Sequence, residues 1–275
     1  MEKVSLSQEK ATLLITLYAK GEESRLPDSL LQDRFAASAL DRIDYDFSRL
    51  GINRDLMIGL AMRAHILDNW ARAFLAFHPE AIVLHLGCGL DSRVFRIDPP
   101  AGVRWFDVDY PEVIELRRRL YPERAGYQLI GTSVTDPAWL ATIMPEGRPA
   151  LIIAEGMFPY LQADEAIPLL ARLTGHFPTG EIAFDAYNRL GLRLIRKQHS
   201  VRVTGAQVHW SLDDAHEIER QVPRLKLMQE LLSYGRQGYH AAQIARMSLS
   251  ARMVIPFFRA IPALGRIGRL LRYRF

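Results

Sequence analysis

The sequence predicts an α/β fold, with a doubly wound, mainly parallel Rossmann-like sheet, a helical N-terminal region and an inserted cap. Short apolar runs alternate with helix-like segments through the middle of the chain, a pattern typical of βαβ units. The first run ends in a glycine-rich turn, and the run at 151–154 is continuously apolar, as a sheet covered on both faces requires. A length of 275 residues suits one domain with such additions.

The elements are expected in a regular order. Residues 5–78 are expected to be helical, because apolar residues recur there at spacings of three and four, and Pro27 and Gly51 divide this region into separate helices. Strands and helices are then expected to alternate. The expected strands are 81–86, 103–108, 127–131, 150–155 and 180–186, and the expected helices lie near 91–96, 111–120, 137–143 and 163–175.

The alternating segment, 79–187, is expected to form the core that binds a ligand at the carboxyl ends of its strands. Residues 1–78 and the polar, interrupted segment 188–222 are expected to cover that core as a cap. Residues 223–275 are expected to complete the sheet. The whole chain is therefore interpreted as one domain with a cap.

The C-terminal part is harder to interpret than the core. A strand is expected at 225–232, and 251–268 is expected to be a helix broken by Pro256 and Pro262. After Glu230 the sequence contains no acidic residue, while arginines accumulate. Such a basic end requires an explanation, either as part of the fold or as a binding surface.

Two structures are compatible with the last residues. Leu271, Tyr273 and Phe275 alternate with Arg272 and Arg274, which predicts a terminal strand whose arginines protect an exposed side from edge pairing. The alternative is a helix that lies on a membrane surface. Its apolar stripe would consist of Leu264, Ile267, Leu270 and Leu271.

The glycine-rich turn predicts a nucleoside site. Gly87 and Gly89 follow an apolar strand, and glycine lets the backbone turn sharply and approach a ligand closely. The dinucleotide fingerprint requires a third glycine where this chain has Ser92, so the site lacks one pyrophosphate contact. Asp109 ends the next strand, where a carboxylate would accept hydrogen bonds from ribose hydroxyls. The alternative role of Asp109 is to cap the helix that begins near Pro111.

Three segments resemble one known family. They are LHLGCGLDSRVFRI, WFDVDYPEVIELRRRL and LIIAEGMFPYL. They are similar to the core motifs of the S-adenosylmethionine-dependent O-methyltransferases, which include leucine carboxyl methyltransferases and tetracenomycin-type polyketide O-methyltransferases. The resemblance implies a class I methyltransferase sheet, S-adenosylmethionine as cofactor, and a small methyl acceptor with a hydroxyl or carboxyl group, such as a polyketide-like secondary metabolite.

The resemblance also implies roles for individual residues. Arg63 is expected to pair with the carboxylate end of the cofactor, and Glu155 with its amino group. In the family an acidic and an apolar residue hold the adenine, and in this chain Ser133 and Val134 take their places. Ser133 has no charge, so Asp136 is a possible substitute, although an aspartate before a proline is also a simple helix cap.

The sequence does not identify a catalytic group. Tyr160 and His209 are candidates for contact with the acceptor, but a lone histidine or tyrosine more often belongs to the surface or the core. The other candidate histidines are His199, His216 and His240. A hydroxyl acceptor would need a general base, whereas a carboxylate acceptor would not. Whether a base exists is left open.

Several site classes are not expected. Cys88 is the only cysteine, which excludes an internal disulfide and a cysteine cluster for zinc, and no metal-binding motif occurs. No lysine lies between Lys20 and Lys197, so no Walker-type lysine is expected in the binding core. No apolar run reaches the ~20 residues of a membrane span and no signal segment is apparent. We therefore expect a cytoplasmic protein that binds no metal and no membrane.

Three alternatives compete with the small-molecule methyltransferase. One is methylation of a protein C-terminal carboxylate. A second is an NAD(P)-dependent oxidoreductase, which Ser92 and the absence of a Tyr-x-x-x-Lys motif disfavour. The third is a membrane or nucleic-acid binder that uses the arginine-rich end, but no nucleic-acid module is present and no nucleic-acid partner is expected. The sequence leaves the oligomeric state and the acceptor open.

Overall fold

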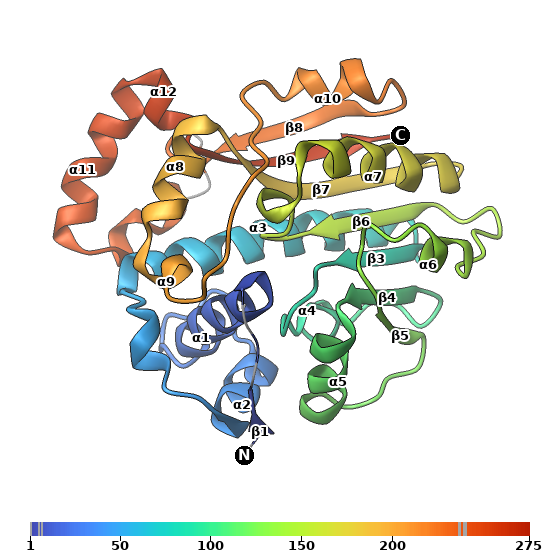
Figure 1. Ribbon diagram of the computed structural model, residues 1–275, viewed down its shortest axis with the longest axis horizontal. Coiled ribbons are helices and arrows are strands. Elements are labelled where there is room, and N and C mark those ends of the chain that lie inside the picture. Colours follow the sequence, from blue (N-terminus) through green and yellow to red (C-terminus); the bar gives the residue numbers. More distant parts are fainter. Residues whose placement is uncertain (1, 5, 7, 236–237, 239–240) are drawn as a thin grey trace.

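The computed structural model describes all residues except 1, 5, 7, 236–237 and 239–240 (Figure 1). Its centre is a seven-stranded sheet with the order β5-β4-β3-β6-β7-β9-β8. The strands are β3 (Ile82–Leu86), β4 (Arg104–Asp109), β5 (Tyr127–Gly131), β6 (Ala150–Ala154), β7 (Gly180–Tyr187), β8 (Lys226–Leu232) and β9 (Gly268–Arg274). Strands β3 to β7 pair in parallel, whereas β9 is antiparallel to both of its neighbours. The doubly wound, mainly parallel sheet is therefore confirmed.

Helices connect the strands and cover both faces of the sheet. They are α1 (Leu13–Ser24), α2 (Arg34–Arg42), α3 (Arg54–Phe77), α4 (Arg93–Ile97), α5 (Pro111–Leu120), α6 (Ala138–Ala141), α7 (Ala163–His176), α8 (Arg189–Lys197), α9 (His199–Arg202), α10 (His216–Gln221), α11 (Leu249–Ala260) and α12 (Pro262–Gly265). The short strands β1 (Glu2–Lys3) and β2 (Ile43–Asp44) form a separate pair, and the 3-10 helices are η1 (Gln8–Thr12), η2 (Phe47–Leu50), η3 (Phe158–Tyr160) and η4 (Ala241–Arg246).

Two apolar layers hold the sheet between helices. On one face, α7 packs its buried leucines, such as Leu170, against β6 and β7. On the other face, the C-terminal half of α3 places Phe74 against Val83 of β3 and Leu151 of β6. Both faces of the central strands are thus covered, which explains why they are apolar at nearly every position. Figure 1 shows α7 and α3 on opposite sides of the strands.

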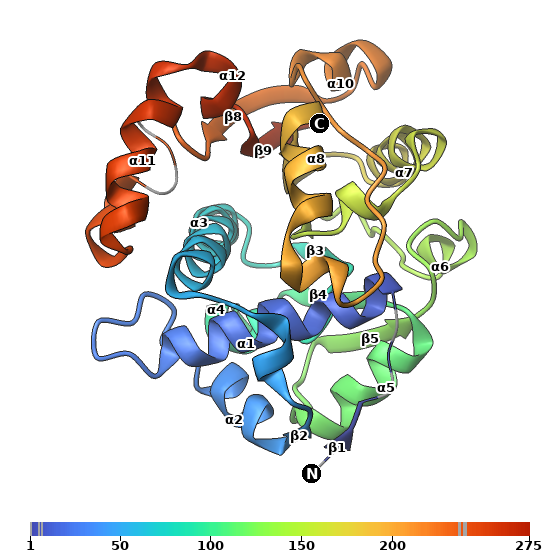
Figure 2. The same cartoon turned by 60° about the vertical axis from the view of Figure 1, so that its left-hand side comes forward.

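The N-terminal region consists of separate helices, as expected. α1 ends at Ser24, shortly before Pro27, and η2 ends at Leu50, directly before Gly51, whose φ of 58° is one that glycine adopts easily. Asn53 then caps α3, because its side chain accepts a hydrogen bond from the backbone N–H of Leu56. Figure 2 shows α1, α3 and α8 grouped at one end of the sheet, with α11 at the rim.

The C-terminal strand forms, but not at the edge of the sheet. β9 lies between β7 and β8, so the expectation that its arginines protect an exposed edge is wrong. Arg272 instead forms an ion pair with Glu181 of β7. The alternative of a membrane-surface helix is also wrong, because Leu270 and Leu271 are fully buried in β9. An interior strand is paired on both sides, so its arginines are not required to prevent edge pairing.

The break expected within 251–268 lies at only one of the two prolines. Pro256 stands inside α11, and the helix continues through it to Ala260. Pro262 begins the next short helix, α12, at its first position, where a missing N–H is tolerated. Pro256 therefore does not end the helix, which places α11 as one unit beside the ligand cavity described below.

Candidate functional site

A cavity of about 700 Å³ lies at the carboxyl ends of the parallel strands. Its polar part is lined by residues that end or directly follow five neighbouring strands, β3 to β7. These residues are Gly87, Cys88, Gly89, Asp91, Asp109, Thr132, Ser133, Val134, Thr135, Glu155, Gly156, Met157 and Tyr187. The strand order reverses between β3 and β6, and such a switch point is where doubly wound sheets bind ligands.

The backbone conformation and the close packing at positions 87 and 89 both require glycine. Their φ angles are 58° and 50°, in the left-handed region that other residues adopt at a cost. A Cβ on Gly87 would lie 2.7 Å from Cγ of Met157, and one on Gly89 would lie 3.0 Å from Cβ of Leu13. The expected space for a ligand at Gly87 is therefore occupied in part by Met157, so a side chain there would displace the protein itself.

Asp109 braces the glycine turn and lines the cavity. One carboxylate oxygen accepts from the backbone N–H of Gly89 at 2.7 Å, and the other accepts from that of Tyr110 at 2.7 Å. Burial raises the pKa of Asp109 to about 6, and the two N–H donors oppose that rise. Tyr110 rather than Asp109 is the residue before α5, and no side chain caps this helix. Asp109 is therefore not the N-cap of α5, which was its alternative role.

Ser133 and Val134 also line the cavity, on the loop after β5. The Ser133 hydroxyl shares a hydrogen bond of 2.8 Å with that of Thr135, so both oxygens lie close to any ligand in this part. Asp136 does not line the cavity; its carboxylate accepts from the backbone N–H of Ala138 at 2.8 Å, in an exposed turn. Asp136 thus caps α6 locally and does not take the place expected for Ser133 beside the adenine.

Glu155 is held by a group of cations. Its carboxylate lies 3.0 Å from Nζ of Lys20 and 3.2 Å from Nε of Arg63, and it also accepts from Arg93. Burial raises the pKa of Glu155, but Lys20, Arg93 and Arg63 lower it by more, so that it lies below its usual range. Its partners are therefore three protein cations, and it does not depend on a cofactor ammonium for compensation.

Arg63 is a buried member of the same group. It is 5% exposed, so it is not a surface arginine. Its guanidinium reaches Glu155 on one side and, on the other, Asp185 at 2.9 Å and the hydroxyl of Tyr187 at 3.3 Å. Asp185 in turn accepts from the backbone N–H of Gly156 at 2.5 Å. This arrangement fixes the arginine at the wall of the cavity.

Lys20 is a site residue that the sequence analysis missed. It comes from α1, yet its Nζ lies 2.9 Å from Asp91 and 3.0 Å from Glu155 and lines the cavity. No Walker-type lysine was expected in the core segment, and Lys20 instead reaches the cavity from the N-terminal helix α1. The available signal was its position: Leu13, Leu17 and Lys20 share one helical face, and a lysine on an apolar face needs a buried acid.

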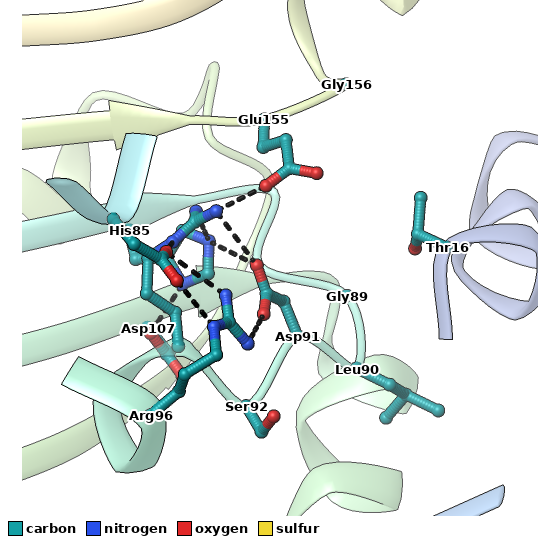
Figure 3. Close-up of polar contacts among 12 residues, drawn as sticks. Thr16, His85, Gly89, Leu90, Asp91, Ser92, Arg96, Asp107, Glu155 and Gly156 are labelled. Atoms are coloured by element: carbon teal, nitrogen blue, oxygen red, sulfur yellow. Dashed lines mark hydrogen bonds and ion pairs between the residues drawn. The ribbon is translucent and has the colours of Figure 1, made fainter. Parts of the chain in front are cut away.

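Arg93 and Arg96 extend the group behind the cavity. Arg93 lies 3.2 Å from Asp91, within the same turn, and 2.8 Å from Asp68. Arg96 contacts Asp91 at 3.0 Å and also pairs with Asp68 and with Asp33. Figure 3 shows Arg96 beside Asp91, in the loop that leads from β3 to α4. The two arginines of α4 thus hold this turn in place.

The candidate histidine His209 is exposed and does not line the cavity. His199 and His216 do not line it either, and His240 lies outside the described residues. The sequence analysis missed His85, which lines the cavity from β3 and contacts Asp107 at 3.1 Å and Arg93 at 3.0 Å. Burial lowers its pKa. A histidine inside an otherwise apolar strand was the signal.

Tyr160 lines the cavity, as expected for a residue near an acceptor. Burial raises its pKa. Cys88 lines it too, and burial raises the pKa of its thiol well above the usual value, so it is a packed, neutral group. Among the described residues, no cluster of three or more His, Cys, Asp or Glu side chains could hold a metal ion. No helix within the described ranges could span a bilayer.

A second part of the cavity is mainly apolar. It is formed by α3, α8, α11 and neighbouring loops, through Leu56, Leu60, Leu194, Ile195, Val208, Met247, Val254, Ile255, Phe258 and Ile267. α11 thus supplies part of the wall, although the sequence analysis placed 223–275 in the sheet. The cavity therefore joins a polar half with ionic groups to an apolar half.

Comparison with known proteins decides which family has this site. A sequence model of leucine carboxyl methyltransferases matches residues 14–174. The chain is 44% identical over 274 residues to the tetracenomycin polyketide synthesis O-methyltransferase TcmP of Streptomyces glaucescens, with 100% of this chain and 99% of the relative covered. The chain belongs to the leucine carboxyl methyltransferase family.

Other relatives agree. This methyltransferase is 37% identical over 259 residues to the S-adenosyl-L-methionine-dependent methyltransferase dpfgK of Gibberella zeae, with 86% of this chain and 87% of the relative covered. A crystal structure from Thermobifida fusca, assigned as a methyltransferase, matches the fold with a TM-score of 0.59 at 17% identity, over 98% of this chain and 94% of that one. The protein is an S-adenosylmethionine-dependent methyltransferase, and the NAD(P)-dependent alternative is excluded.

Proposed function

We propose that this enzyme methylates a hydroxyl or carboxyl oxygen of a small polyketide-like molecule. The observation that carries the proposal is the continuous cavity, in which an ionic half at the strand ends meets an apolar half. The role of the relative TcmP in tetracenomycin polyketide synthesis supports the same substrate class. Methylation of a protein C-terminal carboxylate is the second candidate, since the matching family is that of leucine carboxyl methyltransferases.

We assign the nucleoside of the cofactor to the loops after β3, β4 and β5. Asp109 would accept hydrogen bonds from the ribose hydroxyls, because its carboxylate lines the cavity and is already fixed by two N–H donors. Ser133 and Val134 would lie beside the adenine. The turn with Gly87 and Gly89 would bring the main chain against the ligand, which two positive φ angles make possible.

We assign the methionine end of the cofactor to the ionic group. Arg63 and Lys20 offer donors to its carboxylate, and Glu155 offers an acceptor to its ammonium. These donors and this acceptor together suit the methionine end of the cofactor, which carries both a carboxylate and an ammonium. We further propose that residues 1–275 act as one domain in which 1–78 and 188–222 close the cavity, because α1, α3 and α8 contribute to its wall.

The cofactor supplies an electrophilic methyl group on a sulfonium, and the chain has to hold the acceptor oxygen in line with it. The apolar wall would orient an aromatic acceptor and exclude water, and such positioning can contribute on the order of 7–11 kcal/mol to the acceleration. A hydroxyl acceptor must lose its proton, whereas a carboxylate need not. The raised pKa of Tyr160 keeps it neutral at pH 7, so it would position the acceptor oxygen by a hydrogen bond.

The test is a comparison of acceptors. The purified enzyme is incubated with S-adenosylmethionine and with aromatic polyketides that carry either a phenol or a carboxyl group, and S-adenosylhomocysteine is measured. We expect methylation of at least one aromatic acceptor. Phe258→Ala, which removes part of the apolar wall, should raise the acceptor KM about tenfold or more and leave cofactor affinity unchanged. Methylation of a leucine-terminated peptide in preference to every aromatic acceptor would establish the second candidate.

A further inference from the structure

The wall of the cavity has a surplus of negative charge. Among the described residues, the acidic side chains that line it are Glu9, Asp55, Asp91, Asp109, Glu155 and Glu165, and the basic ones are Lys10, Lys20 and Arg63. The protein as a whole has a formal charge of +4. The formal charge of the cavity wall is thus negative, whereas that of the whole protein is positive. The charge of the wall therefore bears on the charge of the ligand that it binds.

The surplus persists in the buried ionic group itself. Its acids are Asp33, Asp68, Asp91, Glu155 and Asp185, and its cations are Lys20, Arg63, Arg93 and Arg96. Every one of these side chains is almost inaccessible to solvent. The nearby pair of Asp107 and Arg117 is balanced and adds no net charge. Within the described part of the chain this group therefore has one more acid than cations, and because buried charges are screened weakly, that negative charge acts on the cavity.

The methyl donor and its product differ by one charge. S-adenosylmethionine carries a sulfonium, an ammonium and a carboxylate, with a net charge of +1. Transfer of the methyl group to the acceptor oxygen returns the electron pair of the broken C–S bond to sulfur, and the product keeps only the ammonium and the carboxylate. A negative wall therefore favours the donor over the product, because only the donor has the extra positive charge.

We infer that this surplus charge makes the site select the methyl donor over the demethylated product, and that Asp185 sets the selection. The inference depends on the proposed assignment of the cofactor to this cavity. Asp185 does not line the cavity; it lies behind Arg63 at 2.9 Å and accepts from the backbone N–H of Gly156. It is a positioning residue that acts on the cofactor through Arg63 and through its field, and its charge can be removed without deleting a direct contact.

The measured quantity is the ratio of two dissociation constants, that of S-adenosylhomocysteine over that of S-adenosylmethionine, obtained by calorimetry. Asp185→Asn removes the charge at nearly constant size, and should lower the ratio roughly three- to tenfold. Asp185→Glu keeps the charge and changes the geometry, so the ratio should stay as in the unaltered enzyme. Lys20→Gln removes a cation and should shift the ratio in the opposite direction to Asp185→Asn.

These three variants separate charge from structure. Loss of a purely structural contact would weaken both ligands alike and leave the ratio unchanged, and that result in Asp185→Asn overturns the inference. An equal shift in Asp185→Asn and Asp185→Glu also overturns it, because geometry would then be the cause. Circular dichroism and melting temperature show whether each variant is folded before it is titrated.

A second measurement needs no variant. In the unaltered enzyme, an analogue with an ammonium in place of the methylsulfonium should bind at least threefold more tightly than its isostere with a neutral group there. Equal binding of the two analogues contradicts the inference even when Asp185→Asn does not fold. If neither S-adenosylmethionine nor S-adenosylhomocysteine binds, the proposed site itself is wrong, whereas binding without charge selection refutes the present inference alone.

Discussion

At the scale of single residues, Asp109 combines a structural role with a position on the cavity wall. Its two oxygens hold the backbone of Gly89 and Tyr110, and its carboxylate still lines the cavity. Burial raises its pKa to about 6, because a desolvated charge is costly. A ligand that donates hydrogen bonds to this carboxylate would stabilise the ionised form, so cofactor binding and proton loss are expected to be coupled.

We predict that Asp109→Ala weakens S-adenosylmethionine and S-adenosylhomocysteine by the same amount. Both ligands have the same ribose, and hydrogen bonds to a charged group contribute about 1.5–3 kcal/mol. Titration calorimetry checks this, with Asp136→Ala as the matched control, because Asp136 is an acid of the next loop that does not line the cavity. Unchanged binding by a folded Asp109→Ala protein would show that the ribose lies elsewhere.

The pKa of Asp109 gives a second prediction, on pH dependence. The side chain has its usual value of 3.8 when unfolded and about 6 in the folded protein without cofactor. The folded state therefore binds the proton more tightly, and the free energy of unfolding should fall as the pH rises from about 4 to 6. Over the same range, a ligand that requires ionised Asp109 should bind more weakly as the pH falls.

Below about pH 6, the affinity of that ligand is expected to fall by up to tenfold for each pH unit. S-adenosylhomocysteine is titrated between pH 5 and 8, and the affinity should be constant above about pH 7. Asp109→Asn serves as the control, because it cannot titrate and should flatten the curve. A slope that is the same in Asp109→Asn would assign the pH dependence to another group.

At the scale of elements, β9 determines whether the sheet is complete. It pairs with β7 over Glu181 to Tyr187 and with β8 over Lys226 to Leu232, so it is the sole partner of β8 in the described sheet. Tyr273 is fully buried, and its hydroxyl donates to the carbonyl of Ala215 at 2.7 Å. The arginine-rich end is thus part of the core, and its apolar residues cannot serve as a membrane anchor without unfolding.

Deletion of residues 270–275 should lower the melting temperature strongly and reduce solubility in the absence of lipid. The deletion removes an interior strand, exposes the edge of β7 and leaves β8 unpaired, and the loss of a fully buried aromatic residue alone costs about 3–5 kcal/mol. Arg274→Ala, at the exposed end of β9, is the control and should have little effect. A deletion variant with unchanged melting temperature would contradict the position of β9.

At the scale of the whole molecule, the site is assembled from distant parts of the chain. Lys20 on α1, Arg63 on α3, Arg93 on α4, Glu155 after β6 and Asp185 on β7 meet in one ionic group. A buried charge is costly unless it is paired, and each member of the group has at least one partner of opposite sign. The packing of the N-terminal helices against the sheet therefore also forms the proposed cofactor site.

The core of the fold could be predicted because its signals are local. The strand at 127–131 and the helix at 111–120 form at the expected residues, and the other core elements differ by a few residues at their ends. Apolar periodicity, glycine turns and prolines act within a few residues of each other, and a single sequence records them directly. The family resemblance of the motifs around Gly87, Asp109 and Glu155 placed the cavity at the same strand ends.

The partners of these motifs were decided only by the tertiary structure. Lys20 and Asp185 have no spacing relation to Glu155, because the chain between them folds back through several elements. β9 reads as an edge strand by its alternation, and only its insertion between β7 and β8 makes it interior. The sequence by itself determined the elements, the cofactor and the enzyme family. The tertiary structure decided which charges meet, because electrostatic pairing depends on distance in space and on burial, neither of which is written in sequence order.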